Sequence, residues 1–418
     1  MISYEEALKI ITGQAGAPKV QQVPLMQALG KIAAEDVTSP MQVPSFRNSA
    51  MDGFAVCAAQ LASASEPSPV TLKIQTAIAA GDVASAGHTE TAAQIMTGAI
   101  VPEPYDAIVP VELVTASGDT VTFTRPAHMG DHVRLPGEDV TKGQSVLRRG
   151  ETITPETIML LSSLGIVEVA TTHTPKLHIL STGNEITDDY ATQLQGTQIY
   201  NSNVPYLLAV AKQQGLDAQY EGIVRDDPAL FERKIAAIKE PAILISTGAV
   251  SKGVWDFIPE SLKNMGATIH FHRVNIRPGK PVLFAILPNG SFYFGLPGNP
   301  ISAAIGFTFF VMPLVRALQG LPDAPPLMAT LENNFTKKGN FRQFLKASVW
   351  LDETGCLRTN ISDGQESFKI SPMAANNAWV VLEEEKTVVK AGDRVSVVLY
   401  AALKTTSRNE DKTLCQAA

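Results

Sequence analysis

The middle of the chain, residues 174–321, alternates short apolar runs with amphipathic segments. The runs "KLHILSTG", "PAILISTG" and "SFYFG" are short and mostly uncharged, which is typical of buried strands. The segments between them, such as "NVPYLLAVAKQQG" and "PALFERKIAAIKE", have the periodicity of helices. Strand–helix alternation of this length predicts an α/β domain with a mostly parallel sheet.

The flanking regions have a different pattern, in which short strand-like runs are separated by turns. Before residue 174, "VTLKIQTAIAAG" and "DTVTFTRPA" are typical of strands, and "TPETIMLLSSLGI" predicts a helix that begins after Thr154. After the stiff linker "PDAPP", residues 327–404 return to short strands, which predicts a small barrel-like β domain. Residues 405–418 are polar, and we expect a disordered tail there. The predicted fold is therefore multidomain, α/β plus β.

The stretch "YFGLPGNPIS", residues 293–302, joins a predicted strand to an apolar helix through a turn rich in glycine and proline. Asn299 suits the N-cap position and Pro300 suits the first helical position. The free N–H groups of the first turn, with the hydroxyl of Ser302, would then form an anion site. Taken alone, the loop is explained more simply as a tight turn without a ligand. We expect the helix that follows to kink or stop near Pro313.

Other loops after predicted strands favour the ligand. "STGNEI" (181–186) and "STGAVSKGVWDF" (246–257) both place Ser-Thr-Gly directly after an apolar strand, and "IRPGKPV" (276–282) adds two cations. Because loops at the carboxyl ends of parallel strands meet at one edge of a sheet, we expect these loops to converge. Together they predict a site for a phosphorylated or oxyanionic ligand. A P-loop NTPase is excluded, since Val254 and Trp255 stand where a P-loop needs Lys and Ser or Thr.

Charged residues in and beside these loops indicate a metal-assisted anion site. The cations are Arg273, Arg277 and Lys280. The carboxylates are Glu185, Asp226 and Asp256. Carboxylates repel an anionic ligand unless a hard cation lies between them, which indicates Mg²⁺ held by oxygen ligands and by phosphates of the ligand. Taken singly, each acid is more simply a helix cap or a surface charge.

Composition narrows the class of protein. The chain has 418 residues and a net charge of −7, which disfavours binding to nucleic acid or to a membrane surface. Its cysteines, Cys57, Cys356 and Cys415, form no CxxC pair, as expected in a reducing cytosol. The N-terminal "MISYEEALKII" predicts a helix rather than a signal peptide, and the longest apolar helix is interrupted by Pro313 and Arg316. We therefore expect a cytoplasmic protein.

A collinear set of motifs resembles one known family over about residues 4–403. The motifs are "NSAMDGFAV" (48–56), "IMTGAIVPEPYDAIVPVE" (95–112), "GEDV" (137–140), "STGNEI", the spaced residues from Ser246 to Asp256, "RPGKP" (277–281) and "GLPGNPIS". In this order and spacing they resemble the molybdopterin molybdenumtransferase family, or MoeA family, whose animal relatives form the C-terminal part of gephyrin. Each motif is only modestly specific, but the ordered set is strongly specific.

The resemblance implies an architecture and an activity. The implied domains are an N-terminal discontinuous domain (1–45 and 141–173), an inserted β domain (46–140), an α/β molybdopterin-binding domain (174–321) and a C-terminal β domain (327–404). The implied activity is insertion of molybdate into adenylylated molybdopterin with release of AMP, in the presence of Mg²⁺. The resemblance also implies a homodimer, in which the cleft combines the α/β domain of one subunit with the inserted domain of the other. Contact with other proteins of molybdenum cofactor biosynthesis is a further expectation.

The resemblance also implies roles for single residues. The implied catalytic residues are Asp52, Thr97, Asp139, Glu185, Asp226 and Asp256, of which Glu185, Asp226 and Asp256 would hold the metal. The implied binding residues for molybdate and molybdopterin are Thr182, Gly183, Gly248, Ser251, Arg273, Arg277, Lys280, Pro281, Asn299, Ser302 and Arg342. Among these, Lys280, Ser302 and Arg342 match the family's pattern for molybdate ligands. A C-terminal serine motif fits only loosely, so which of Ser367 and Ser371 contacts the ligand stays open.

Two alternative functions stay open at this level. The family usually has Lys where this chain has Arg273 and Arg277, and Arg keeps the charge but is larger and forked. A divergent paralogue that handles tungstate, or that only binds molybdopterin, is therefore the first alternative. The second is a non-enzymatic scaffold, because relatives of this domain also bind receptor peptides. A scaffold requires an exposed apolar groove and leaves the acidic residues unexplained.

Overall fold

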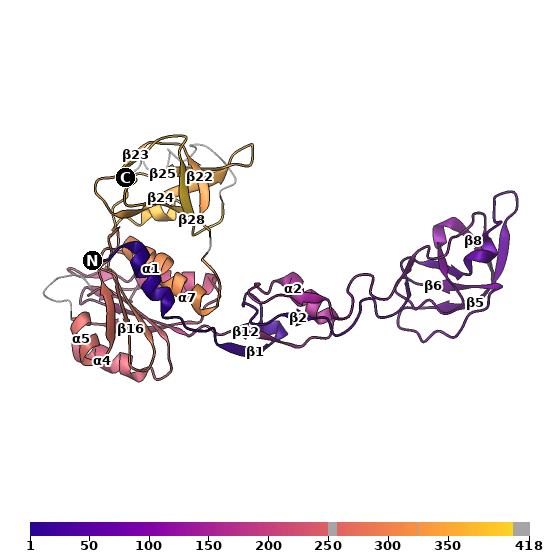
Figure 1. The fold of residues 1–418 in the computed structure, drawn as a ribbon, viewed down its shortest axis with the longest axis horizontal. Helices are drawn as coiled ribbons and strands as arrows, with labels where there is room; N and C mark the ends of the chain where they lie inside the picture. The colour runs from indigo at the N-terminus through magenta and orange to yellow at the C-terminus, as the bar shows by residue number, and fades with distance from the viewer. Residues whose placement is uncertain (250–256, 324, 404–418) are drawn as a thin grey trace. The chain divides into compact units, whose positions relative to one another are not determined.

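The computed structural model describes residues 1–249, 257–323 and 325–403. Contacts divide the chain into two units, the first formed by residues 1–21 and the part from 172 onward, and the second by residues 22–171. Figure 1 shows the elements of both units. The predicted tail at 405–418 lies outside the described residues. The finer division into domains stays a prediction.

The first unit is built around the sheet that the sequence predicted. In the described residues its strand order is β16 (Ala218–Val224), β13 (Leu177–Thr182), β17 (Ile243–Thr247), β21 (Phe292–Leu296), β20 (Leu283–Ile286) and β18 (Thr268–His272). From β16 to β21 the neighbouring strands are parallel, whereas β20 is antiparallel to both β21 and β18. The sheet is therefore mixed with a parallel majority, and the predicted α/β fold is confirmed.

Helices cover both faces of this sheet. One face carries α3 (Asn203–Gln213) and the helix that begins at Pro300, against which α1 (Tyr4–Gly13) packs. The other face carries α4 (Pro228–Ala237) and α5 (Ile258–Asn264). A short parallel pair, β14 (Ile186–Thr187) and β15 (Ile199–Tyr200), precedes α3.

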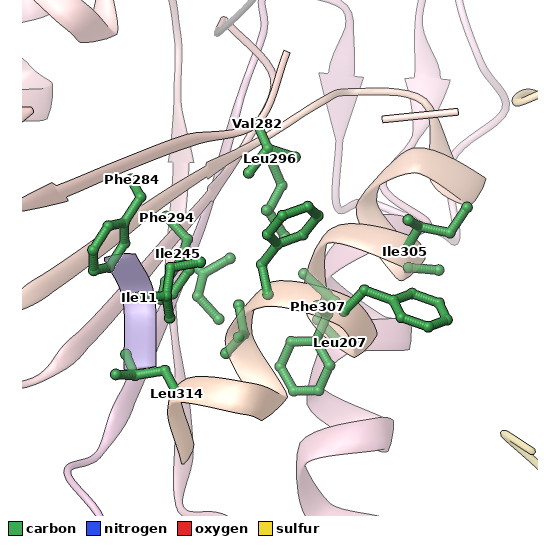
Figure 2. Packing of buried hydrophobic residues seen from close by; sticks show 14 of the residues in the cluster. Ile11, Leu207, Ile245, Val282, Phe284, Phe294, Leu296, Ile305, Phe307 and Leu314 are labelled. Carbon is green, nitrogen blue, oxygen red and sulfur yellow. The ribbon is translucent and has the colours of Figure 1, made fainter. Parts of the chain in front are cut away.

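Alternation along the strands supplies a separate core on each face, since successive side chains point to opposite sides of a strand. Figure 2 shows side chains of the core between the sheet and the long helix, among them Ile245 and Phe294 from the strands and Phe307 from the helix, and Leu207 and Ile11 belong to the same core. The residues next along the strands, Leu244 and Tyr293, belong to the core beneath α4 and α5.

The apolar helix does not stop at Pro313. It continues from α6 (Pro300–Gly306) through a π-helical segment (Phe307–Val311) into α7 (Met312–Leu318). The Met312 N–H donates to the Phe307 carbonyl in this wider turn, and the wider turn carries the chain past a proline that has no N–H to donate. The expected interruption of the apolar run is therefore wrong. The helix is long and apolar enough to cross a membrane, and 72% of its most apolar window is buried inside the protein.

The C-terminal part of the first unit forms the predicted barrel. Neighbouring strands run in the order β24 (Arg342–Leu351), β25 (Leu357–Ile361), β22 (Leu327–Leu331), β28 (Arg394–Leu399) and β26 (Ala378–Leu382). The pairing of β26 with β24 closes the ring around an apolar interior. Strand β19 (Ile276–Arg277) joins β24, so the loop after β18 is tied to the barrel. The smaller elements here are β23 (Phe335–Thr336), β27 (Val388–Val389) and α8 (Ser371–Ala374).

The second unit contains a β domain and a smaller helical element. Its main sheet has the order β7 (Ala107–Pro110), β4 (Gly53–Val56), β6 (Thr91–Ile95), β5 (Val70–Ile78), β9 (Thr120–Phe123) and β8 (Val114–Ser117). Helix α2 (Pro155–Ser163) begins at the predicted cap, where the Thr154 hydroxyl accepts from the Thr157 N–H. The remaining elements are β1 (Val20–Pro24) with β12 (Glu168–Thr172), β2 (Val37–Thr38) with β11 (Ser145–Leu147), β3 (Asn48–Ser49) with β10 (Val133–Arg134), and the 3₁₀ turns Leu25–Gln27, Ala58–Leu61 and Val111–Leu113.

Candidate functional site

A cavity of about 560 Å³ lies at the carboxyl ends of the parallel strands in the first unit. Its walls come from the loops that follow β13, β17 and β21, which the sequence predicted to converge, and from the loop after β16. In doubly wound sheets this edge is where ligands bind, because the loops there diverge and leave a crevice. The cavity is therefore the candidate site of this protein.

The two Ser-Thr-Gly loops lie against each other in the wall of the cavity. The Thr182 hydroxyl donates to the Thr247 carbonyl at 3.1 Å, and the Gly248 N–H donates to the Leu296 carbonyl at 2.9 Å. Gly248 has a φ of +100°, and a Cβ built there would lie 2.6 Å from the Thr182 carbonyl oxygen. Only glycine permits both this backbone conformation and this close approach.

Two of the predicted carboxylates line this cavity. Glu185 folds back over Gly183, where an added Cβ would lie 2.7 Å from its Oε2. Asp226 lies in the loop after β16, and its Oδ2 accepts a hydrogen bond from Asn184 Nδ2 at 2.7 Å. The described residues contain no group of three or more metal-ligating side chains. Two carboxylates in one cavity fit Mg²⁺, which binds through one or two carboxylates plus substrate phosphates.

Two predicted residues of this cavity fall outside the described part of the chain. They are Asp256, a predicted metal ligand, and Ser251, a predicted binding residue. Their roles stay predictions. Pro281, in contrast, is placed in the cavity wall.

The turn before α6 forms another wall, but Asn299 does not act as predicted there. It occupies the N-cap position, yet among the described residues its side chain accepts no capping bond. Instead Asn299 Nδ2 donates to Ser367 Oγ at 3.1 Å, and the Ile301 N–H donates to the Ser367 carbonyl at 3.2 Å. A barrel loop therefore supplies the acceptor that a capping side chain normally provides. Ser302 follows within the helix and is only 3% exposed.

The predicted cations lie on the turn between β18 and β20. Backbone bonds from Arg273 N–H to the Val282 carbonyl and from Val274 N–H to the Lys280 carbonyl shape this turn. Lys280 is exposed. The Arg277 guanidinium lies 5.7 Å from the centre of the Phe341 ring. Arg277 also lines a second cavity of about 610 Å³, whose remaining walls come mostly from the barrel.

Arg342 does not lie in the wall of the first cavity. Its guanidinium forms ion pairs with Glu5 of α1 and with Glu384, and lies 4.7 Å from the centre of the Tyr4 ring. These contacts join α1 to the barrel. The structure therefore does not bring Arg342 together with Glu185 and Asp226.

In the second unit, Asp52 and Thr97 form a hydrogen-bonded pair. Asp52 Oδ1 accepts from the Thr97 N–H at 2.7 Å and from its hydroxyl at 2.8 Å. These two bonds, the backbone one first, hold the pKa of Asp52 below its ordinary value. Asp139 lies further along the chain, where its N–H donates to the Val43 carbonyl. The catalytic roles of Asp52, Thr97 and Asp139 stay predictions.

Comparison with known proteins covers nearly the whole chain. Family models match consecutive parts, namely the MoeA N-terminal region (domain I and II) at residues 2–165, "Probable molybdopterin binding domain" at 178–317 and the MoeA C-terminal region (domain IV) at 328–400. The molybdopterin molybdenumtransferase of Haemophilus influenzae is 35% identical over 407 residues, which covers 95% of this chain and 98% of that protein. The chain belongs to the molybdopterin molybdenumtransferase family. The suspected resemblance is confirmed.

Other members of the molybdopterin molybdenumtransferase family agree with this placement. The enzyme of Synechococcus elongatus is 31% identical, with 95% of this chain and 99% of that protein covered. The crystal structure of the molybdopterin biosynthesis MoeA protein from Pyrococcus horikosii has a TM-score of 0.77 at 30% identity, covering 96% of this chain and all of that one. The shared fold thus extends over all parts of the chain.

The site also contains residues that the sequence reasoning missed. Asn203 lines the cavity and donates from Nδ2 to the Gly298 carbonyl at 2.7 Å. Ile186 and Ile199 face each other across the β14–β15 pair and form its apolar wall. An Asn at the start of a predicted helix could have indicated Asn203, because Asn side chains at that position often bond neighbouring backbone groups. The isoleucines gave no signal, since they are paired across twelve intervening residues.

Proposed function

We propose that this protein inserts molybdate into adenylylated molybdopterin and releases AMP, giving Mo-molybdopterin. Family membership supports the reaction class. The observation that carries the proposal for this chain is the cavity in which Gly183, Gly248 and Asn299 meet the carboxylates of Glu185 and Asp226. Glycine loops let phosphate groups approach backbone N–H groups, and carboxylates beside them call for a bridging cation.

The proposed roles follow from this arrangement. Glu185 and Asp226 would hold Mg²⁺, with Asp256 as the third predicted ligand. When bound, the ion supplies Lewis-acid polarisation of the phosphoryl group and offsets charge on the departing AMP. The glycine loops would orient the phosphates, and Lys280 and Ser302 would position molybdate through charge and hydrogen bonds.

We also propose the wider setting that the sequence indicated. A homodimer would let Asp52, Thr97 and Asp139 of a second copy complete the cleft. A reducing cytoplasm suits the free thiols of Cys57 and Cys356. Analytical ultracentrifugation of the full chain tests the dimer. A monomer at micromolar concentration would contradict the proposal that a second copy completes the cleft.

The test is AMP release from adenylylated molybdopterin, measured with molybdate in the presence of Mg²⁺ and again with EDTA. We expect release with Mg²⁺ and its loss with EDTA, because the carboxylates alone repel the phosphates. Tungstate is added as a competitor to decide between the two oxyanions. Tight pterin binding without AMP release, with or without metal, would instead support a divergent binding paralogue or a scaffold.

A further inference from the structure

A loop of the barrel, residues 362–370, contacts the wall of the cavity. The Ser367 carbonyl accepts from the Ile301 N–H at 3.2 Å, and Ser367 Oγ accepts from Asn299 Nδ2 at 3.1 Å. Asn299 is itself a wall residue. The N-cap residue and the second residue of α6 are therefore bonded to the same serine, one through its side chain and one through its backbone. The position of this wall depends on where the loop lies.

A buried lysine of the barrel strand β24 holds the loop. Lys346 of β24 is 0% exposed, and its ammonium donates to the carbonyls of Glu366 and Lys369 at 3.1 and 3.2 Å. Burial lowers the pKa of Lys346, whereas the charge of Glu366 raises it. An ammonium removed from water is costly unless acceptors replace the water, so the two carbonyls are kept at the ammonium. Those carbonyls flank Ser367 on either side.

The side chain of Gln365 also bonds the backbone of Lys346. Its Oε1 accepts from the Lys346 N–H at 2.9 Å, and its Nε2 donates to the Lys346 carbonyl, also at 2.9 Å. Nε2 further donates to the Ser362 carbonyl at 2.6 Å. The loop is thus bonded to β24 through Gln365 as well as through the Lys346 ammonium.

We propose that Ser367 is a positioning residue for the cavity wall at Asn299, and that Lys346 holds the loop that carries it. The barrel then contributes to the site by positioning this wall. The inference rests on the proposed function only for the identity of the ligand. The mechanical link between Lys346, Ser367 and the first turn of α6 stands on the contacts themselves.

The test compares two buried lysines of the barrel, replaced one at a time in the full chain. Lys346→Met removes the ammonium that holds the loop. Lys337→Met is the matched control, since Lys337 is 3% exposed and bonds the carbonyls of Phe341 and Glu384 at 2.8 and 2.7 Å. Hydrogen exchange of the 297–303 peptide is measured in both. We expect at least tenfold faster exchange in Lys346→Met than in Lys337→Met. Equal exchange would overturn the proposal.

Ser367→Ala is a second variant with a smaller change, and it tests the proposal if Lys346→Met does not fold. It removes one hydrogen-bond acceptor from Asn299 and leaves the backbone bond. We expect about a fivefold rise in KM for adenylylated molybdopterin with kcat less affected, since one hydrogen bond of ordinary strength is lost. An unchanged KM would contradict the positioning role. If the unmodified protein releases no AMP, the proposed function fails, and the exchange experiment still decides this inference.

Discussion

Replacing Gly248 by alanine tests whether the two Ser-Thr-Gly loops meet as closely as described. The φ of +100° is a conformation that an L residue adopts at a cost of about 1–2 kcal/mol. The new Cβ would lie 2.6 Å from the Thr182 carbonyl oxygen, and relieving such overpacking costs about 1–3 kcal/mol more. We therefore expect Gly248→Ala to lower the free energy of unfolding by about 2–5 kcal/mol in total.

The matched control is Gly290→Ala in the turn between β20 and β21. Gly290 has a φ of +83°, and a Cβ there would meet nothing within 4 Å, so only the backbone cost remains. Thermal unfolding of both variants should differ by several degrees, at about 2–4 °C for each kcal/mol. Binding of adenylylated molybdopterin should weaken at least tenfold in Gly248→Ala alone, because the displaced loop lines the cavity. Equal melting temperatures and equal affinities in the two variants would refute the close approach.

The remaining predictions concern a helix cap, a core residue and a titrating pair. Asp227→Ala should lower the free energy of unfolding by about 1 kcal/mol in urea and keep AMP release, because its carboxylate caps α4. Asp226→Ala should leave the free energy of unfolding unchanged and abolish AMP release. Retained AMP release in this variant would show that Asp226 is not a metal ligand. Phe310→Ala should cost about 3–5 kcal/mol, since the ring is fully buried, and a loss below 1 kcal/mol by urea unfolding would contradict the described packing. Thr97→Val should raise the pKa of Asp52 partway toward its ordinary value, read by carboxyl NMR titration, because the larger backbone bond remains.

The sign of the Asp52 effect follows from linkage. A carboxyl whose pKa is lowered by folding contributes stability above the pKa of the unfolded chain, and that contribution is lost as pH falls through the folded pKa. Thr97→Val should therefore weaken the dependence of stability on acid pH in the second unit. A pKa of Asp52 that does not move would mean that the hydroxyl bond is absent in solution.

The sequence predicted the elements well where local pattern decides them. The short apolar runs at β13, β17 and β21 predict buried strands. Because these strands are parallel, the loops after them lie at the same edge of the sheet. Closure of the barrel could be suggested only in outline, because it depends on β26 pairing with β24 across more than thirty residues. Such long-range register leaves no local signal.

Two local rules failed where the surrounding structure offered another solution. Asn299 fits the rules of an N-cap, but a partner 68 residues away bonds its side chain. Pro313 fits the rules of a helix stop, yet the π-helical segment before it accommodates the missing donor. The ligand role of Arg342 stays a prediction, and the structure shows its ion pairs with Glu5 and Glu384.

The central claim is that this protein couples AMP release to transfer of molybdenum onto molybdopterin. The most direct measurement is the amount of molybdenum bound to the pterin product, by elemental mass spectrometry, for each AMP released in the presence of Mg²⁺. The account predicts one molybdenum for each AMP, and neither product in Asp226→Ala. AMP release that proceeds equally without molybdate, or that leaves the pterin free of metal, would contradict it.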